Sequence, residues 1–170
     1  MQKINLLGYK ISHLKKVFVE NGFSDLDARK VFPWIHKKLT KRFGDMSNVS
    51  LEVREKLKEK FSLSRGKCVT LLTSKDGTKK ALLEFEDGNR IETVFIPDEK
   101  RNTICVSSQV GCAMGCKFCH TGTQGFVRNL TSAEIMAQVI FWNDQFSISN
   151  IVFMGMGEPL ANLDNVVSAI

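Results

Sequence analysis

Three closely spaced cysteines constrain this chain more than any other feature of its sequence. Cys112, Cys116 and Cys119 form a C-x3-C-x2-C array within VGCAMGCKFCHTGTQG, residues 110–125. Thiolates at such short spacing usually bind one metal ion or one cluster. A closed structural zinc site uses four ligands, whereas three thiolates on a 4Fe–4S cluster leave one iron open to a substrate. The array therefore favours a metal centre with an open position.

Spacing alone leaves two alternatives to an iron–sulfur cluster. The run from Cys116 to His120 fits C-x-x-C-H, which is the attachment signature of c-type haem. The same residues together with Cys112 could close a Cys3His zinc site. Chance clustering of the cysteines is the remaining interpretation.

The rest of the composition indicates a soluble, cytoplasmic protein without a membrane segment. Its apolar runs fall short of the roughly 18 residues that a membrane span needs. The N-terminal sequence MQKINLLGYK has polar residues where a signal peptide would be apolar. In a reducing compartment, clustered cysteines bind metals or catalyse reactions more often than they form disulfides. A c-type haem is disfavoured as well, because its attachment normally follows export and this chain is expected to stay in the cytoplasm.

Positive charge is concentrated in the first third of the chain. Through Lys67 there are 16 Lys and Arg against 7 Asp and Glu, whereas the remainder has 8 against 11. A basic module beside a mildly acidic region indicates a polyanionic partner, most simply a nucleic acid. The alternative is a solvated helical surface that is rich in lysine. The candidate phosphate contacts are Lys37, Lys38, Lys41, Arg42, Arg54, Lys56, Lys58 and Lys60.

Changes in hydrophobic period predict three regions. Residues 1–67 are expected to be a helical accessory domain, in which Pro33 kinks or restarts a helix. Residues 68–97 alternate between β-rich runs and Asp-Gly pairs, which predicts a short meander. Alternation in its last strand places Glu92 on a partly apolar face, where a carboxylate is usually solvated and sometimes catalytic.

Residues 98–170 are predicted to begin an α/β fold with a parallel sheet. A strand at 102–107 carries Cys105 and leads into the cysteine loop, and the capping box Thr131–Glu134 opens a helix. The apolar run 150–154 is expected to be a strand buried on both faces. It is followed by the segment GMGEP, residues 155–159, and another helix. Both loops follow strand C-termini, where parallel α/β proteins build their sites. Two parallel strands are too few for a closed sheet, so the chain looks cut within its fold.

At this point the residues resemble a known family. The cysteine array, with Phe118 before its last cysteine, resembles the signature of radical S-adenosylmethionine (radical SAM) enzymes. The runs CVSSQVGCAMGCKFC (105–119) and GMGEP resemble the RlmN/Cfr family, and within it the branch of dual-specificity RNA methyltransferases that methylate C2 of adenosine in 23S rRNA and tRNA. The resemblance implies an incomplete radical SAM (β/α) barrel, here its N-terminal portion, preceded by a basic helical domain that faces RNA and by a meander.

The resemblance also implies roles for individual residues. The three cysteines of the array would ligate a 4Fe–4S cluster whose open iron binds S-adenosylmethionine, and Gly157 and Glu158 would lie against the amino end of that cofactor. The family forms a 5′-deoxyadenosyl radical and carries the methyl group on a cysteine. Glu92 matches the base that removes the ring proton. Cys105 matches the cysteine that releases the product by forming a disulfide with the carrier.

Several implied partners lie outside the sequence. No residue matches the methyl-carrying cysteine, and Cys68 does not replace it, so this chain alone is expected to be inactive. A second chain that supplies the missing part and an electron donor such as flavodoxin are the expected partners. The alternatives are the related branch that methylates C8 of adenosine and confers antibiotic resistance, and a non-catalytic fragment that binds metal or RNA.

Overall fold

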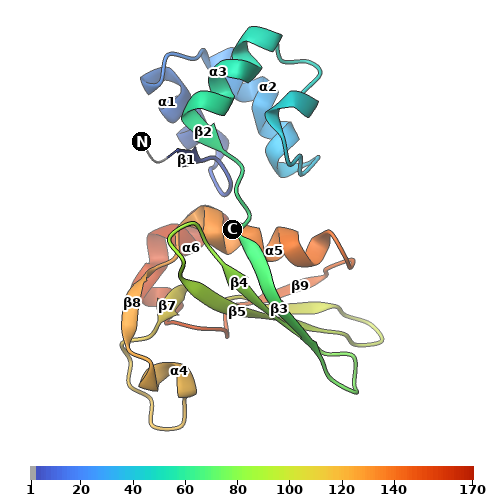
Figure 1. Cartoon of the computed structure of the whole chain (residues 1–170), viewed down its shortest axis with the longest axis vertical. Helices are drawn as coiled ribbons and strands as arrows, with labels where there is room; N and C mark the ends of the chain where they lie inside the picture. The colour runs from blue at the N-terminus through green and yellow to red at the C-terminus, as the bar shows by residue number, and fades with distance from the viewer. Residues whose placement is uncertain (1–2) are drawn as a thin grey trace. The chain divides into compact units, whose positions relative to one another are not determined.

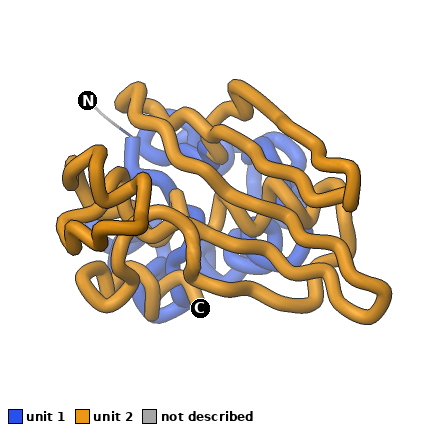
Figure 2. Tube along the Cα trace, turned by 90° about the horizontal axis from the view of Figure 1, so that it is seen from below, with its two compact units in different colours: residues 1–64 blue, residues 65–170 orange. Residues whose placement is uncertain are grey.

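The computed structural model describes residues 3–170, and the chain forms two compact units (Figure 2). Unit 1 spans residues 1–64 and unit 2 spans residues 65–170. The division into an accessory domain (1–67), a meander (68–97) and the start of a radical SAM core (98–170) stays a prediction. No helix within residues 3–170 combines the length and the apolar composition that crossing a bilayer requires.

Unit 1 is a small helical unit around an aromatic core. Phe18 is fully buried and stacks on Phe61, with ring centroids 5.4 Å apart, and Phe23 packs at 5.3 Å from Phe18. Burying such large rings stabilises a unit of this size more than its short helices could stabilise themselves. The elements are β1 (Ile4–Asn5), α1 (Ile11–Glu20), α2 (Asp25–His36), a 3-10 helix (Phe43–Asp45), α3 (Leu51–Lys60) and β2 (Phe61–Ser62), with β1 parallel to β2.

Local sequence signals explain where α2 begins and ends. The Ser24 hydroxyl accepts a hydrogen bond from the Asp27 amide, and the Asp27 carboxylate accepts one from the Ser24 amide, which forms a capping box. The helix then continues through Pro33, so the predicted restart at this residue is wrong. Pro33 lies in the last turn, and its carbonyl still accepts from the amide of Lys37 at 3.0 Å. A proline this close to the helix end removes one backbone hydrogen bond without ending the helix earlier.

Unit 2 is built on a five-stranded sheet with helices against one face (Figure 1). The order is β3-β4-β5-β6-β9; the first four strands run antiparallel, and β6 pairs with β9 in parallel. The meander predicted from Asp-Gly turns therefore shares one sheet with the parallel pair. The strands are β3 (Lys67–Thr73), β4 (Lys79–Glu84), β5 (Arg90–Ile96), β6 (Thr103–Cys105) and β9 (Asn150–Val152).

A second, smaller hairpin and four helical segments complete unit 2. The strand β7 (Gln109–Gly111) pairs antiparallel with β8 (Phe126–Asn129), and the cysteine loop connects them. The helical segments are α4 (His120–Thr123), α5 (Ser132–Asn143), a 3-10 helix (Pro159–Asn162) and α6 (Leu163–Ala169). The predicted capping box of α5 is confirmed, because Thr131 and Glu134 exchange side-chain and backbone hydrogen bonds.

The two faces of the sheet differ in character. One face packs its buried residues, such as Ile91 and Ile104, with Ile135 and Trp142 of α5. The other face, called the open face here, carries the half-buried side chains Lys80, Leu82, Glu92, Val94 and Cys105. The predicted double burial of the last strand is wrong: Ile151 in β9 is 47% exposed. In this chain β9 has a sheet neighbour on one side only, so its side chains are incompletely covered.

Candidate active site

Two glycines close the base of the cysteine loop. Gly111 has φ +72°, a conformation that side chains with a Cβ rarely adopt. A Cβ on Gly111 would lie 1.8 Å from the carbonyl oxygen of Gly125, so only glycine fits. Directly beside this contact, the amide of Cys112 donates to the same carbonyl at 3.0 Å. The chain therefore enters and leaves the loop at one point, which holds residues 112–125 together as a unit.

The three cysteines of the array are free thiols on this loop. Cys116 is exposed, and Cys112 and Cys119 are half-buried. The backbone amide of Gly122 hydrogen-bonds to the sulfur of Cys119 and, against the effect of burial, lowers the pKa of that thiol. Such amides stabilise the thiolate, which is the form that binds metals. The donor chemistry therefore fits a thiolate-bound cluster.

The three sulfurs of the array do not share one point in this structure. Within residues 3–170, no three His, Cys, Asp or Glu side chains lie close enough together to share a metal ion. The segment between Cys112 and Cys119 has turns but no regular helix or strand, and Gly115 within it has φ +62°. The three cysteines therefore lie on irregular backbone.

The GMGEP segment packs directly on the residues that follow β6. Gly155 and Gly157 are needed for this approach, because a Cβ would lie 2.6 Å from Ser107 Oγ at the first position and 2.4 Å from Gln109 Cβ at the second. The carbonyl of Met156 accepts hydrogen bonds from the amides of Ser108 and Gln109, at 2.8 and 3.2 Å. GMGEP is therefore joined by backbone contacts to residues 108–109, which lead through β7 into the cysteine loop.

Glu158 is held by hydrogen bonds at both its backbone and its side chain. Its amide donates to Gln109 Oε1 at 2.9 Å, and its carboxylate oxygen Oε1 accepts from the amide of Leu160 at 3.1 Å. The carboxylate thus caps the 3-10 helix that begins at Pro159. This cap fixes the orientation of the one acidic side chain in GMGEP and leaves its second oxygen for another donor.

Glu92 lies on the open face, as alternation predicted. Its carboxylate pairs with Lys80 on the neighbouring strand, with Nζ 2.8 Å from Oε1, and its side chain is 46% exposed. Its backbone is fixed from two sides: the carbonyl accepts from Ser107 Oγ at 2.6 Å, and the amide donates to Met156 Sδ at 3.4 Å. Since the Ser107 hydroxyl also accepts from the amide of Met156 at 2.8 Å, the strand of Glu92 is connected to GMGEP.

Cys105 lies on the same face at the end of β6. It pairs with Val94 in the sheet register, which places it near the position of Glu92 on the open face. Burial raises the pKa of the Cys105 thiol, although a hydrogen bond from the backbone of Met154 opposes that effect. The carbonyl of Cys105 accepts from the buried hydroxyl of Thr93 at 2.9 Å, and that hydroxyl accepts from the indole of Trp142 at 3.1 Å. The backbone at Cys105 is therefore fixed to the core.

No disulfide is present among the five cysteines, all of which lie within the described residues 3–170. The disulfide implied for Cys105 is thus not formed inside this chain, and Cys68 projects toward the core on the other side of the sheet.

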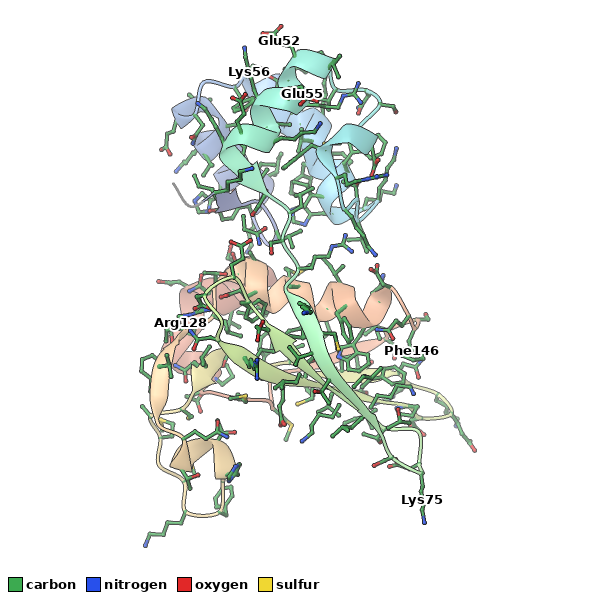
Figure 3. All side chains as sticks on the ribbon, viewed as in Figure 1. Glu52, Glu55, Lys56, Lys75, Arg128 and Phe146 are labelled. Carbon is green, nitrogen blue, oxygen red and sulfur yellow. The ribbon has the colours of Figure 1, made fainter. Side chains whose placement is uncertain are left out.

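Arg128 braces the strand that leaves the cysteine loop. Its Nη1 and Nη2 contact both carboxylate oxygens of Glu134 at 2.9 and 2.7 Å, and its Nε contacts Asp87 at 2.6 Å. Arg128 is labelled in Figure 3. These two carboxylates raise the pKa of the Arg128 guanidinium, Glu134 more strongly than Asp87. The guanidinium in turn lowers the pKa of Asp87 to about 2. The loop is thereby fixed to α5 and to the turn between β4 and β5.

Sequence reasoning missed the residues that position these groups. Gln138 of α5 is fully buried, and its side-chain amide pairs with both the amide and the carbonyl of Ser107, at 2.7 and 2.9 Å. The side chain of Asn162 donates to the carbonyls of Ser108 and Leu130, at 2.7 and 2.8 Å. A polar residue on an apolar helix face was the available signal for Gln138, because a buried amide needs partners.

The basic side chains of unit 1 are mostly engaged with neighbours in their own unit. Lys56 pairs with Glu52 at 2.7 Å, and both carry labels in Figure 3. Lys38 lies over the ring of Trp34, 3.5 Å from its centroid. Such exposed contacts are weak and exchange readily for a phosphate. Other contacts of this kind join Arg42 to Asp45, Lys58 to Glu55, Arg54 to the Gly44 carbonyl and Lys60 to the Asn21 carbonyl.

Both units match known protein families. Residues 4–63 match the family described as the ribosomal RNA large subunit methyltransferase N-terminal domain, and residues 106–170 match the radical SAM superfamily. The chain is 45% identical over its full length to the dual-specificity RNA methyltransferase RlmN of Geotalea uraniireducens (strain Rf4), of which it covers 50%. It is 46% identical, over 99% of the chain, to the protein of the same name from Francisella tularensis subsp. novicida (strain U112), of which it covers 48%.

A solved structure confirms the fold class. The crystal structure of a radical SAM methyltransferase from Sphaerobacter thermophilus superposes with a TM-score of 0.85 at 34% identity, over 98% of this chain and 50% of that one. The predicted partial radical SAM α/β fold is therefore confirmed. The chain spans about half the length of the curated relatives it matches.

Proposed function

Because this chain belongs to the radical SAM superfamily and to its RlmN-type branch, we propose that it forms part of an RNA methyltransferase that modifies C2 of adenosine in 23S rRNA and tRNA. One observation carries the proposal most directly. GMGEP is joined through Ser107 to the strand that bears Glu92, beside Cys105 on the open face, and the segment of Ser107 leads through β7 into the cysteine loop. A carboxylate and a thiol are thereby positioned close to the loop that would hold the cofactor.

The cofactors that the family implies are a 4Fe–4S cluster and S-adenosylmethionine. Cys112, Cys116 and Cys119 would hold the cluster, and their free thiols on one glycine-closed loop support this role. When bound, the cluster and S-adenosylmethionine supply a 5′-deoxyadenosyl radical. Gly157 and Glu158 would lie against the amino end of S-adenosylmethionine. There the Glu158 carboxylate, which caps the 3-10 helix, would present a negative charge to the ammonium of the cofactor.

Glu92 and Cys105 would act on the RNA base and on the methyl carrier. Glu92 would accept the proton from the ring carbon, a role for which its carboxylate, with one oxygen paired and the other open, is suited. The sulfur of Cys105 would attack the sulfur of a methyl-carrying cysteine that these residues do not include. An S–S bond would form as Cys105 gives up its thiol proton and the C–S bond to the product carbon breaks. The electron pair of that bond would stay on the carbon, which takes up a proton to become the methyl group.

Unit 1 would bring the enzyme to its RNA. Its match to the methyltransferase N-terminal domain and its excess of basic residues support an RNA-facing accessory role for the region 1–67. The region 68–97 would connect it to a radical SAM core that starts near residue 98. We further propose a cytoplasmic location, where rRNA and tRNA are found, and a flavodoxin-type electron donor. A segment or second chain carrying the methyl carrier would complete the site.

Anaerobic reconstitution with iron and sulfide, applied to the complete enzyme that contains these residues, tests the proposal. We expect about four irons per chain, an EPR signal that shifts on adding S-adenosylmethionine, and 2-methyladenosine in an RNA transcript. If 8-methyladenosine forms instead, the enzyme belongs to the related branch that methylates C8. Tight stoichiometric zinc, with neither cluster nor methylated RNA, would show that the chain is a metal- or RNA-binding module.

A further inference from the structure

The open face carries two ion pairs, and one of them involves the proposed base. Arg90 contacts Glu84 directly across the β4–β5 ladder at 2.7 Å. Lys80 reaches diagonally across the same ladder to Glu92 at 2.8 Å. Arg90 thus pairs with Glu84, and Lys80 is the cation that contacts Glu92. No sequence pattern assigned Lys80 a role.

Stability does not account for the Lys80–Glu92 pair. Both side chains are close to half exposed, at 44% and 46%, and solvated pairs of this kind contribute little to folding. The pair instead restricts the carboxylate: Nζ holds Oε1, while the backbone of Glu92 is fixed by Ser107 and Met156. A catalytic carboxylate needs this kind of fixed geometry, because its efficiency depends on its reach to one particular proton.

We propose that Lys80 is a positioning residue that orients the Glu92 carboxylate for proton removal, an inference that rests on the proposed function of Glu92. The Lys80 ammonium binds Oε1, which leaves Oε2 to face the adenine ring of the RNA. When the ring C–H bond breaks, its proton passes to Oε2 and its electron pair stays with the ring. Lys80 gains and loses no proton, and it stabilises the carboxylate before the transfer.

Lys79 offers a matched control. It carries the same charge one residue earlier in β4, but alternation points it to the other face. There its Nζ contacts Thr73 Oγ1 at 3.2 Å and lies 6.0 Å from the ring centroid of Phe146, which is labelled in Figure 3. A Lys79→Gln variant therefore changes the net charge and local strand composition as Lys80→Gln does, without touching Glu92.

The experiment compares methylation kinetics of the complete enzyme and its variants on one RNA transcript. For Lys80→Gln we expect kcat to fall about tenfold while KM for RNA stays within about twofold, because positioning acts on the chemical step. More 5′-deoxyadenosine should be formed per methylated adenosine, since radical formation does not need Glu92. Lys80→Arg should restore kcat to within about threefold, and Lys79→Gln should match the wild type.

A double variant separates positioning from other roles. If Lys80 acts only through Glu92, then Lys80→Gln combined with Glu92→Gln should be no slower than Glu92→Gln alone. The proposal would be overturned by a further loss of rate in the double variant or by an unchanged kcat for Lys80→Gln. A rise in KM for RNA with no change in kcat would also overturn it, because Lys80 would then be a phosphate contact. If the wild-type enzyme forms neither 5′-deoxyadenosine nor methylated RNA, the proposed function itself fails.

Discussion

The hydroxyl of Ser107 donates a hydrogen bond of 2.6 Å to the backbone carbonyl of Glu92. The same hydroxyl accepts a hydrogen bond of 2.8 Å from the amide of Met156. One small side chain therefore connects the strand of the proposed base to the loop proposed to face S-adenosylmethionine. This explains why a polar residue is fully buried where the chain leaves β6.

Ser107→Ala should destabilise unit 2 by about 1–3 kcal/mol, because it leaves the carbonyl of Glu92 and the amide of Met156 without their partner. The adjacent Ser108 supplies a control: it is also buried, but its Oγ has no hydrogen-bond partner, so Ser108→Ala should cost much less. Urea unfolding, followed by Trp142 fluorescence in a Trp34→Phe background, measures the difference. Equal losses for the two serines would contradict the importance of this hydrogen bond.

Gly111→Ala should prevent the cysteine loop from closing. The new Cβ would lie 1.8 Å from the Gly125 carbonyl oxygen, and the residue would also have to keep φ +72°. Gly88 has φ +79° but open space around it, so Gly88→Ala should cost only the backbone strain of about 1–2 kcal/mol. We expect iron content after anaerobic reconstitution to fall severalfold for the first variant and to stay unchanged for the second. Full iron loading of Gly111→Ala would show that loop closure is not needed.

Asp87 should make unit 2 less stable in acid. Arg128 is the main cause that lowers the pKa of Asp87 to about 2, below its ordinary value of 3.8. The group stabilises the folded state fully above about pH 4, and this contribution is lost as the pH falls toward 2. Because the side chain of Asp87 is 36% exposed, Asp87→Asn should cost only about 1 kcal/mol at pH 7 and almost nothing near pH 2.

Unfolding free energies measured between pH 2 and pH 7 check this prediction. The neighbouring Glu86 is exposed, and Glu86→Gln serves as the control that removes one carboxylate beside the same turn while keeping the contact between Asp87 and Arg128. A difference between wild type and Asp87→Asn that persists unchanged at the acid end would mean that the Arg128 contact does not carry the effect.

The sequence alone predicted those parts of the fold that depend on neighbouring residues. The capping box at Thr131 and the strand alternation that exposes Glu92 need only local spacing, and both are confirmed. The short hairpin of β7 and β8 was missed because three or four residues around a long loop give no clear period. The contacts of Lys80 and Gln138 depend on sheet register and helix packing, which join residues far apart in the chain and cannot be read from spacing.

Cys105 should react slowly with alkylating agents in the metal-free chain. Burial raises the pKa of its thiol, so little thiolate is present at pH 8, and the thiolate is the reactive form. Cys116 is exposed on the loop and should be labelled by iodoacetamide about tenfold faster or more. Peptide mapping by mass spectrometry after short labelling measures the two rates, and in concentrated urea they should converge because burial is lost. Equal labelling rates in the folded chain would show that burial does not slow the reaction of Cys105. Slower labelling of Cys105 would mean that its proposed attack on the methyl carrier requires activation of this thiol in the complete enzyme.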